Sequence, residues 1–443
     1  MGRTLTHNRF TAVLTWAMRL LFGGIFILSG FAKSIDPWGT IYKVNDYLAV
    51  LGIDLWPNLR LVAVFALCAL EFFIGVMVLT GCFRRSAPVL GALVMAFMLP
   101  FSLWIAMTNP VEDCGCFGDA VVISNWATFW KNVVLAIAAG WLCLYNRSIR
   151  SLITPALQWI SFVSTALYIV VIELFGYASQ PLLDFRAYKE GEPLIERGLE
   201  EDNDPSFIFI YEKDGVQKEF TEDDVLPDES DGWKFVDRKE QPHAASDNTQ
   251  KKDDKTFRIW SRDGEDDVTD EVIEETGEQI LIMIPDLTET SISGSWKLNS
   301  MSSWAGRNNI SLLAVVAGSQ EEIDEWEDLS MISYPLYTAD DTAIKEVVRG
   351  NPGVVYLKNG IIEWKSTLRA IDVDDFMAPG TSGDPMSFRR DNKAILLNCT
   401  YLYLAVIAVL MVLSLLPSLK RMYLDRKTVT SDTTATDDDT ARL

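Results

Sequence analysis

Two cysteines one residue apart are the residues of this chain best suited to chemistry. They are Cys114 and Cys116, in the loop DCGCFGD at positions 113–119, between two long apolar segments. A Cys-Gly-Cys pair can close into a small disulfide ring, and Gly115 supplies the backbone freedom that the ring requires. So short a ring is strained, and strained disulfides exchange readily with other thiols. The loop therefore favours thiol–disulfide exchange.

Two other uses of the cysteine pair stay open. A structural disulfide is the second, although closing so small a ring stabilises a fold little. A metal site is the third, and it lacks ligands. The only histidines are His7, on the other side of the predicted membrane, and His243, in a predicted linker. We rank redox chemistry first, a structural disulfide second and a metal site last.

A cysteine reacts as its thiolate, which a nearby positive charge favours. The candidates are Lys33, at the end of the first apolar segment, and Lys131, early in the fourth. Glu112, Asp113 and Asp119 act in the opposite direction unless they pair with these lysines. We therefore expect a catalytic set of the two cysteines and the two lysines.

Apolar segments must hold this loop in place. Each is close to the ~20 residues that a helix needs to cross ~30 Å of hydrocarbon. They are Trp16–Phe31, Leu61–Thr80, Val89–Thr108, Phe129–Leu144, Leu152–Phe175 and Ala394–Leu416. One such segment could be a buried helix of a soluble protein, but six in one chain indicate a multi-pass membrane protein.

The charges between the segments predict how the chain is oriented. Basic residues occupy alternate connections and follow the last segment: Arg3, Arg9, Arg84, Arg85, Arg147, Arg150, Lys420, Arg421, Arg426 and Lys427. Lys and Arg mark cytoplasmic loops. We therefore expect a bacterial inner-membrane protein with both termini in the cytoplasm. The cysteine loop and residues 177–393 would then lie in the periplasm, where disulfides persist. The first segment lacks a cleavage-site pattern and is interpreted as a retained anchor.

Residues 177–393 carry most of the acidity. They contain 48 acidic and 23 basic residues, a net charge of −25, whereas the rest of the chain contains 13 and 16, a net charge of +3. So acidic a segment argues against nucleic acid as a partner. The segment has no cysteine, so it must fold on its own core.

Two charges fall inside the apolar segments. Arg19 and Glu71 lie at roughly 16 and 12 Å from the cytoplasmic ends at ~1.5 Å per residue. Buried charges in a membrane usually have partners or functions. We predict an intramembrane ion pair between them, with a proton or quinone-headgroup site as the alternative.

The exported segment divides into two parts. Phe207–Tyr211 and Val216–Phe220 flank a turn sequence and predict a hairpin, and Gln241–Lys255 is typical of a linker. The second part, residues 278–378, alternates strands and helices. Strands are expected at Gln279–Ile284, Ser311–Ala317, Val354–Lys358 and Ile361–Lys365, and helices at Ser293–Ala305, Gln320–Leu329, Asp341–Arg349 and Ile371–Met377.

That order, with Asn351-Pro352-Gly353 before the last hairpin, resembles the thioredoxin fold. Pro352 then matches the cis-proline of that family. The family's redox cysteines should follow the first strand, but there the sequence is PDLTET, at positions 285–290. The resemblance therefore implies the architecture without the dithiol activity.

The N-terminal third resembles DoxX-type membrane proteins. The similar stretches are RLLFG at 19–23, FILSGFAK at 26–33, Asp36-Pro37 and ALEFFIGV at 69–76. The loop CGCFG at 114–118 is similar to that of the MauE branch, the methylamine-utilisation proteins, which are linked to disulfide formation in an extracytoplasmic partner enzyme. The longer layout, with DFR at 184–186 and RGNPG at 349–353, resembles Bacteroidetes proteins of this type. A methylamine substrate is not implied.

The expected fold is a DoxX-like four-helix membrane bundle with two further spans and an α/β thioredoxin-like extracytoplasmic domain. The expected units are residues 1–150 (four-span domain), 151–176 (fifth span), 177–277 (acidic β-rich region and linker), 278–378 (thioredoxin-like domain), 394–416 (sixth span) and 417–443 (disordered cytoplasmic tail).

Two functions follow from these residues. The first is a membrane thiol–disulfide oxidoreductase or redox-protein maturation factor that uses Cys114 and Cys116. Its partners would be the lipid bilayer and an extracytoplasmic client protein, and a quinone or a second membrane protein would accept electrons. The second is a non-catalytic membrane scaffold with a structural disulfide and a partner-binding exodomain. A transporter is a weaker third, because Arg19 and Glu71 are too few to trace a pathway.

Overall fold

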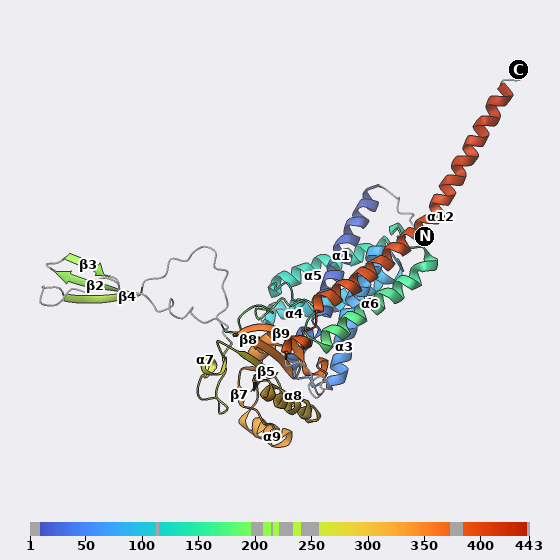
Figure 1. Cartoon of the computed structure of the whole chain (residues 1–443). Helices are drawn as coiled ribbons and strands as arrows, with labels where there is room; N and C mark the ends of the chain where they lie inside the picture. The colour runs from blue at the N-terminus through green and yellow to red at the C-terminus, as the bar shows by residue number, and fades with distance from the viewer. Residues whose placement is uncertain are drawn as a thin grey trace.

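The computed structural model describes residues 9–111, 115–195, 207–213, 216–220, 234–240, 257–372 and 384–440. In the three short segments between 207 and 240, and from residue 417 onward, it describes the backbone alone. A helical bundle and an α/β domain make up most of the described chain (Figure 1). Cys114 lies outside the described residues.

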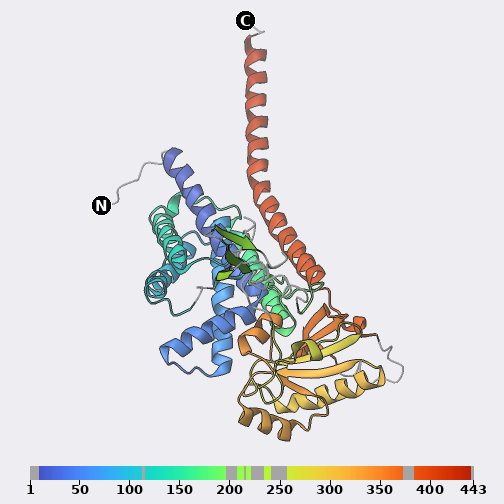
Figure 2. The ribbon, with the colours of Figure 1, turned by 90° about the vertical axis from the view of Figure 1, so that its left-hand side faces the viewer.

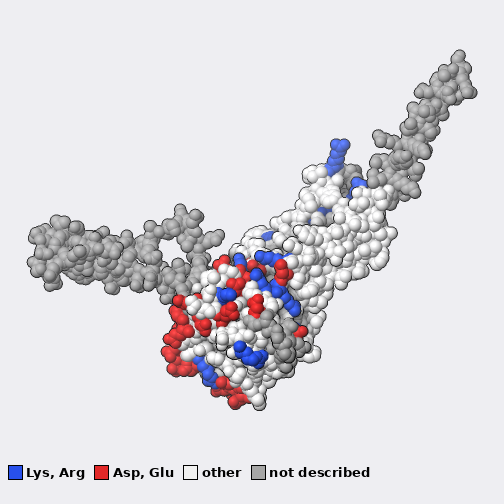
Figure 3. Space-filling model, viewed as in Figure 1, with Lys and Arg blue, Asp and Glu red and all other residues white. Residues whose placement is uncertain are grey.

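Within those residues, six helices are long and apolar enough to cross a membrane. They are α1 (Arg9–Ile35), α3 (Pro57–Thr80), α4 (Ser86–Thr108), α5 (Asn125–Leu144), α6 (Gln158–Ala178) and α12 (Asn392–Thr440). Each covers a predicted apolar segment or most of one, which confirms the predicted spans. In the view of Figure 3, Lys, Arg, Asp and Glu gather on the α/β domain, and the flank of the bundle is almost free of them. That apolar flank is the surface a bilayer would cover.

Helices α1 and α3 touch through their backbones. A Cβ atom added to Gly30 would lie 2.3 Å from the backbone nitrogen of Phe72, and one added to Gly75 would lie 2.6 Å from that of Ile27. Small residues allow this approach, which is typical of helix pairs in membranes. The pair forms the centre on which the other helices pack.

A short helix covers one end of the bundle, and it was not predicted from the sequence. Helix α2 (Pro37–Leu51) follows α1 directly. The Asp36 carboxylate accepts a hydrogen bond from the backbone N–H of Gly39 (3.0 Å), and Pro37 occupies the first turn. An Asp cap followed by proline is a strong start signal for a helix. Strand β1 (Cys116–Asp119) contacts both α1 and α2 at this end.

The α/β domain is built on a five-stranded sheet of order β7-β6-β5-β8-β9. Its strands are β5 (Glu278–Ile284), β6 (Ser311–Val316), β7 (Leu336–Thr338), β8 (Gly353–Lys358) and β9 (Ile361–Thr367). The pairs β5–β6 and β6–β7 are parallel, and β5–β8 and β8–β9 are antiparallel. Three short helices connect these strands, α8 (Ser295–Arg307), α9 (Gln320–Ser330) and α10 (Asp341–Val347), and α7 (Thr269–Val272) precedes β5. The Asn351–Pro352 peptide bond is cis.

Alternating residues of the sheet serve two cores. Ile280, Ile282 and Ile284 of β5 pack into one apolar cluster with α8, whereas Leu281 and Met283 pack into the other. The sheet is therefore covered on both faces, which explains the continuous apolar run of its central strand.

A second sheet has the strand order β3-β2-β4. Its strands are β2 (Phe207–Lys213), β3 (Val216–Phe220) and β4 (Lys234–Glu240). Strands β2 and β3 are antiparallel, which confirms the predicted hairpin. The predicted linker at 241–255 lies outside the described residues.

Most predicted elements of the α/β domain agree with the structure to within one or two residues. Strand β7 was not predicted, and most of the helix predicted at Ile371–Met377 falls outside the described residues. The chain end also differs from the expectation of a disordered tail from residue 417, because α12 continues to Thr440. The apolar span provides a formed helix, so extending it requires no new nucleation.

Both connections of the α/β domain lead into neighbouring helices. Helix α6 enters the domain and α12 leaves it, and the two helices pack together (Figure 2). The rings of Tyr168 and Tyr403 stack with centroids 4.4 Å apart, and the hydroxyl groups of Thr165 and Tyr403 lie 3.0 Å apart. The domain is thus held at both ends against one end of the bundle.

Candidate functional site

The described part of the cysteine loop is a tight turn on the end of α1. Gly115 and Gly118 have φ values of +62° and +54°, in the left-handed region that glycine adopts without strain. The N–H of Gly118 donates to the carbonyl oxygen of Gly115 (3.1 Å). A Cβ on Gly118 would lie 3.7 Å from the carbonyl oxygen of Ala32. The turn therefore packs directly on the last turns of α1.

A buried polar group holds the loop from the bundle side. The Ser29 hydroxyl lies 2.7 Å from the carbonyl oxygen of Cys116 and 2.8 Å from a carboxylate oxygen of Glu71. The Lys33 ammonium lies 2.8 Å from both oxygens of Glu71. Lys33 is also close enough to Cys116 for their charges to interact. The Ser29 hydroxyl thus connects the buried ion pair of Lys33 and Glu71 to the backbone of Cys116.

Lys131 approaches the loop from α5. Its ammonium lies 4.3 Å from the ring centroid of Phe117, the residue after Cys116. Both predicted lysines thus lie near this loop, Lys33 on α1 and Lys131 on α5. Among the residues that the structure describes, no group of three His, Cys, Asp or Glu side chains is arranged to hold a metal ion.

The predicted ion pair between Arg19 and Glu71 is wrong. Glu71 pairs with Lys33 instead. The Arg19 guanidinium donates to the carbonyl oxygens of Val78 (3.1 Å), Leu79 (2.7 Å) and Arg150 (3.0 Å), at the other end of the bundle. Carbonyls in the last turn of a helix lack partners within the helix, so a cation there is stabilising. Arg19 therefore caps α3.

Residues that were not among the predicted site residues hold the loop from the side of the α/β domain. Arg349 follows α10 and is 5% exposed. Its Nε lies 2.9 Å from Asp36, at the junction of α1 and α2, and its Nη2 bonds the carboxylate of Asp119, in β1. Burial opposes the charge on Arg349, but Asp36 and Asp119 outweigh it and raise the pKa of the guanidinium. Burial raises the pKa of Asp119, and Arg349 offsets part of that rise.

The sequence did contain a signal for this contact. Arg349 stands in the RGNPG stretch and Asp36 in the Asp-Pro pair, and both stretches carry the family resemblance. Nothing in a single sequence shows that residues so far apart along the chain meet. The ion pair between Arg349 and Asp36 becomes visible only in the folded structure.

A second buried cluster fixes the start of the α/β domain. The carboxylate of Asp184 pairs with Arg186 (2.9 Å) and with Lys365 of β9 (2.6 Å). Burial opposes ionisation of Asp184, but the two cations prevail and lower its pKa. Gln180 links this cluster to the first, because its amide nitrogen donates to the carbonyl oxygen of Arg349 (2.7 Å). Arg186 also lies 3.5 Å from the side-chain oxygen of Gln180.

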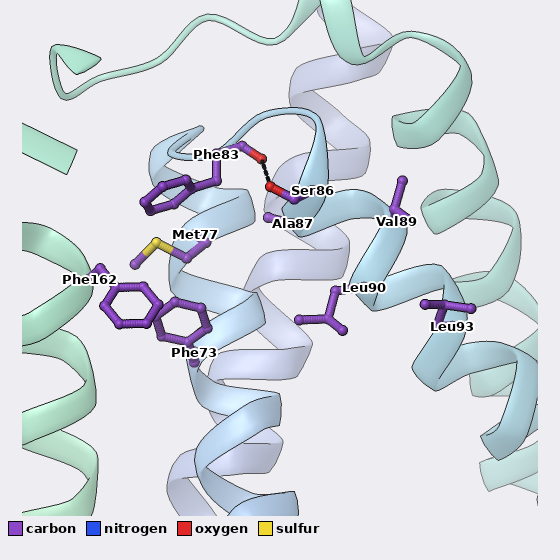
Figure 4. A pocket seen from close by; sticks show the side chains of 9 residues that line it. All are labelled: Phe73, Met77, Phe83, Ser86, Ala87, Val89, Leu90, Leu93 and Phe162. Atoms are coloured by element: carbon purple, nitrogen blue, oxygen red, sulfur yellow. Dashed lines mark hydrogen bonds between the residues drawn. The ribbon is translucent and has the colours of Figure 1, made fainter. Parts of the chain in front are cut away.

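An apolar groove of about 360 Å³ opens on the flank of the bundle between α3, α4 and α6. Figure 4 shows Phe73, Met77 and Phe162 gathered on one side of it, with Phe83 and Ser86 at its end. It lies at the turn between α3 and α4, which is the opposite end of α4 from the cysteine loop. The groove is therefore separate from the loop.

The membrane bundle matches a known family. Residues 11–145 match the family model described as methylamine utilisation protein MauE, and this range includes the cysteine loop. Residues 205–242 match a domain of unknown function. No curated protein matches the chain.

Proposed function

We propose that this MauE/DoxX-like membrane protein is a thiol–disulfide redox or redox-protein maturation factor whose working pair is Cys114 and Cys116. In the oxidising direction, the disulfide of the pair accepts two electrons from a client dithiol. The client gains a disulfide, the pair becomes two thiols, and both client protons are transferred to the pair. Thiolate attack on a disulfide sulfur is the chemical step in each exchange.

The observation that carries this proposal is the position of the loop over the buried pair of Lys33 and Glu71. Ser29 bonds the carbonyl of Cys116 and also contacts Glu71, the carboxylate that pairs with Lys33. A cation near a thiol favours the thiolate, which is the reactive form. Lys131, stacked on Phe117, adds a second positive charge at the loop.

The proposal places the loop and the α/β domain in the bacterial periplasm, with both termini in the cytoplasm. The basic residues between α3 and α4 and after α5 support this orientation. An oxidising compartment is needed, because a disulfide in the cytosol would be reduced.

The α/β domain belongs to the proposal as a cysteine-free thioredoxin-like module that holds a client over the loop. Its strand order and the cis peptide bond before β8 support that fold. The turn after β5, where a redox pair would stand, is Pro285-Asp286-Leu287. Any redox chemistry therefore resides in the membrane domain.

A quinone is one proposed acceptor class, but the apolar groove that could hold its ring does not lie at the loop. The apolar groove lies at the other end of α4 and has Ser86 as its polar lining residue. We therefore route no step through a quinone. A disulfide of a second membrane protein would reset the pair by the same exchange.

The test is reductant-dependent labelling in the intact membrane. A membrane-impermeant maleimide should label the two loop cysteines only after mild reduction, and a reduced dithiol client should allow labelling in place of the reductant. Labelling that never depends on reductant would refute cycling. Reaction at the cytoplasmic face alone would refute the orientation.

A scaffold is the second candidate, favoured by the buried ion pairs between the α/β domain and the bundle. Cys114→Ser and Cys116→Ser separate the two functions. If client disulfides still form at normal protein abundance in both variants, the scaffold function is correct.

A further inference from the structure

The cysteine loop lies between two ion pairs that come from different parts of the fold. On the bundle side, Lys33 pairs with Glu71, and Ser29 connects that pair to Cys116. On the other side, Arg349 of the α/β domain pairs with Asp119. Asp119 and Cys116 are the two ends of strand β1, so each ion pair holds one end of the strand.

We propose that Arg349 is a positioning residue for the cysteine loop: through Asp119 and Asp36 it fixes strand β1 on the bundle, and it compensates the negative charge of Asp119, three residues from Cys116. The inference rests on the proposed redox function and deepens it. It means that the α/β domain completes a redox site to which it contributes no sulfur.

Geometry supports a specific role for this arginine. It is almost fully buried, and its Nε and Nη2 reach two different carboxylates, one beside α1 and one in β1. A guanidinium suits this task because its donors are fixed in a plane. Its backbone is itself held, since the N–H of Arg349 donates to the side-chain oxygen of Gln180 (2.9 Å). The arginine thus comes from a rigid part of the α/β domain.

The charges around β1 determine whether replacing Arg349 slows or speeds the reaction of Cys116. Without Arg349, the carboxylates of Asp36 and Asp119 would lose their ion pairs, and Asp119 lies three residues from Cys116 in β1. An uncompensated negative charge near a thiol disfavours the thiolate, and we expect the thiolate fraction at neutral pH to change on the order of tenfold. Arg349→Gln should therefore slow the reaction of Cys116. Asp119→Asn leaves the arginine in place and should speed the reaction several-fold.

The experiment measures the alkylation rate of reduced Cys116 against pH, in full-length protein with Cys114→Ser. Labelled peptides identify the site by mass spectrometry. Arg349→Gln should lower the rate on the order of tenfold at pH 7 and move the midpoint of the profile to higher pH. Arg349→Lys should recover most of the rate, and Arg349→Gln with Asp119→Asn should return it toward the parent value. Arg262→Gln is the matched control, because Arg262 is exposed and pairs with Asp324 and Glu327, far from the loop in sequence and fold.

Opposite changes in the two single variants would support charge compensation, because a loosened fold would change both rates in one direction. Changes of the same sign, or profiles that coincide with the parent, would overturn the inference. Arg60→Gln removes a different ion pair between the bundle and the α/β domain, an exposed contact with Glu289 (2.7 Å). An equal effect from that variant would also overturn it. Reductant dependence in the parent protein tests the proposed function separately.

Discussion

The Lys33 ammonium lies 2.8 Å from both carboxylate oxygens of Glu71, in the end of the bundle that holds the cysteine loop. Both side chains are 8% exposed. Removing one partner of a buried pair leaves an uncompensated charge, which costs roughly 3–5 kcal/mol. This pair is therefore the most sensitive point of the membrane domain.

We expect Lys33→Met and Glu71→Gln each to lower the stability of the bundle by roughly 3 kcal/mol. The double variant should lose clearly less than the sum, because its remaining groups carry no net charge. Thermal unfolding in detergent measures all three. Additive losses would show that the two side chains do not interact.

Arg19 gives a matched test of the corrected pairing. Arg19→Met should destabilise the protein by about 3 kcal/mol, because carbonyls at the end of α3 lose a charged donor. Its effect should add to that of Glu71→Gln, since the two residues belong to different networks. Arg9→Met is the control, because Arg9 is exposed. Strong coupling between Arg19 and Glu71 would restore the sequence prediction.

The contact between α1 and α3 predicts a sharp difference between two glycines of one helix. Gly30→Ala should cost about 2 kcal/mol or more, because its methyl group meets the backbone of Phe72. Gly24→Ala has nothing within 4 Å and should be neutral or slightly stabilising. Folded yield and melting temperature of the two variants, side by side, measure the difference. Equal behaviour would contradict the close packing.

Asp184 predicts a dependence on acid. Its pKa is lowered in the folded state, so its stabilisation is complete above the ordinary carboxyl pKa of about 4 and is lost as pH falls through the lower folded value. Asp184→Asn should cost roughly 3 kcal/mol at pH 7, because Arg186 and Lys365 lose their carboxylate. The difference in free energy of unfolding between Asp184→Asn and the parent protein should be smaller at pH 3 than at pH 7.

Urea unfolding at both pH values measures this effect. Asp328→Asn, on the exposed face of α9, serves as the control and should change little at either pH. A difference that stays constant between pH 7 and pH 3 would contradict the ionised cluster.

The fold was predictable wherever a local pattern was long. Twenty apolar residues indicate a span whatever surrounds them, and the hairpin turn at Asn359-Gly360 marks its own strands. Strand β7 has three residues and depends on its neighbour in the sheet, so no local pattern revealed it. Helix α2 begins with the Asp36-Pro37 start signal, which we interpreted from the sequence only as a family motif.

The site was predictable in its residue types but not in its pairings. Lys33 and Lys131 were selected from their positions near the loop, and both contact it or its support. Arg19 and Glu71 were paired by depth in the membrane, but depth does not determine which side of a helix a residue faces. Arg349 lies 230 residues from Asp119 along the chain, and only the tertiary fold joins them.

The α/β domain lies in the chain between α6 and α12, and these two helices lie side by side. A protease that cut once between them would release nothing, since each fragment would keep its own membrane helix and the fragments would stay joined by the Tyr168 and Tyr403 contact. Shedding of this domain would require two cuts. Loss of the domain from cells after a single cut would contradict this arrangement.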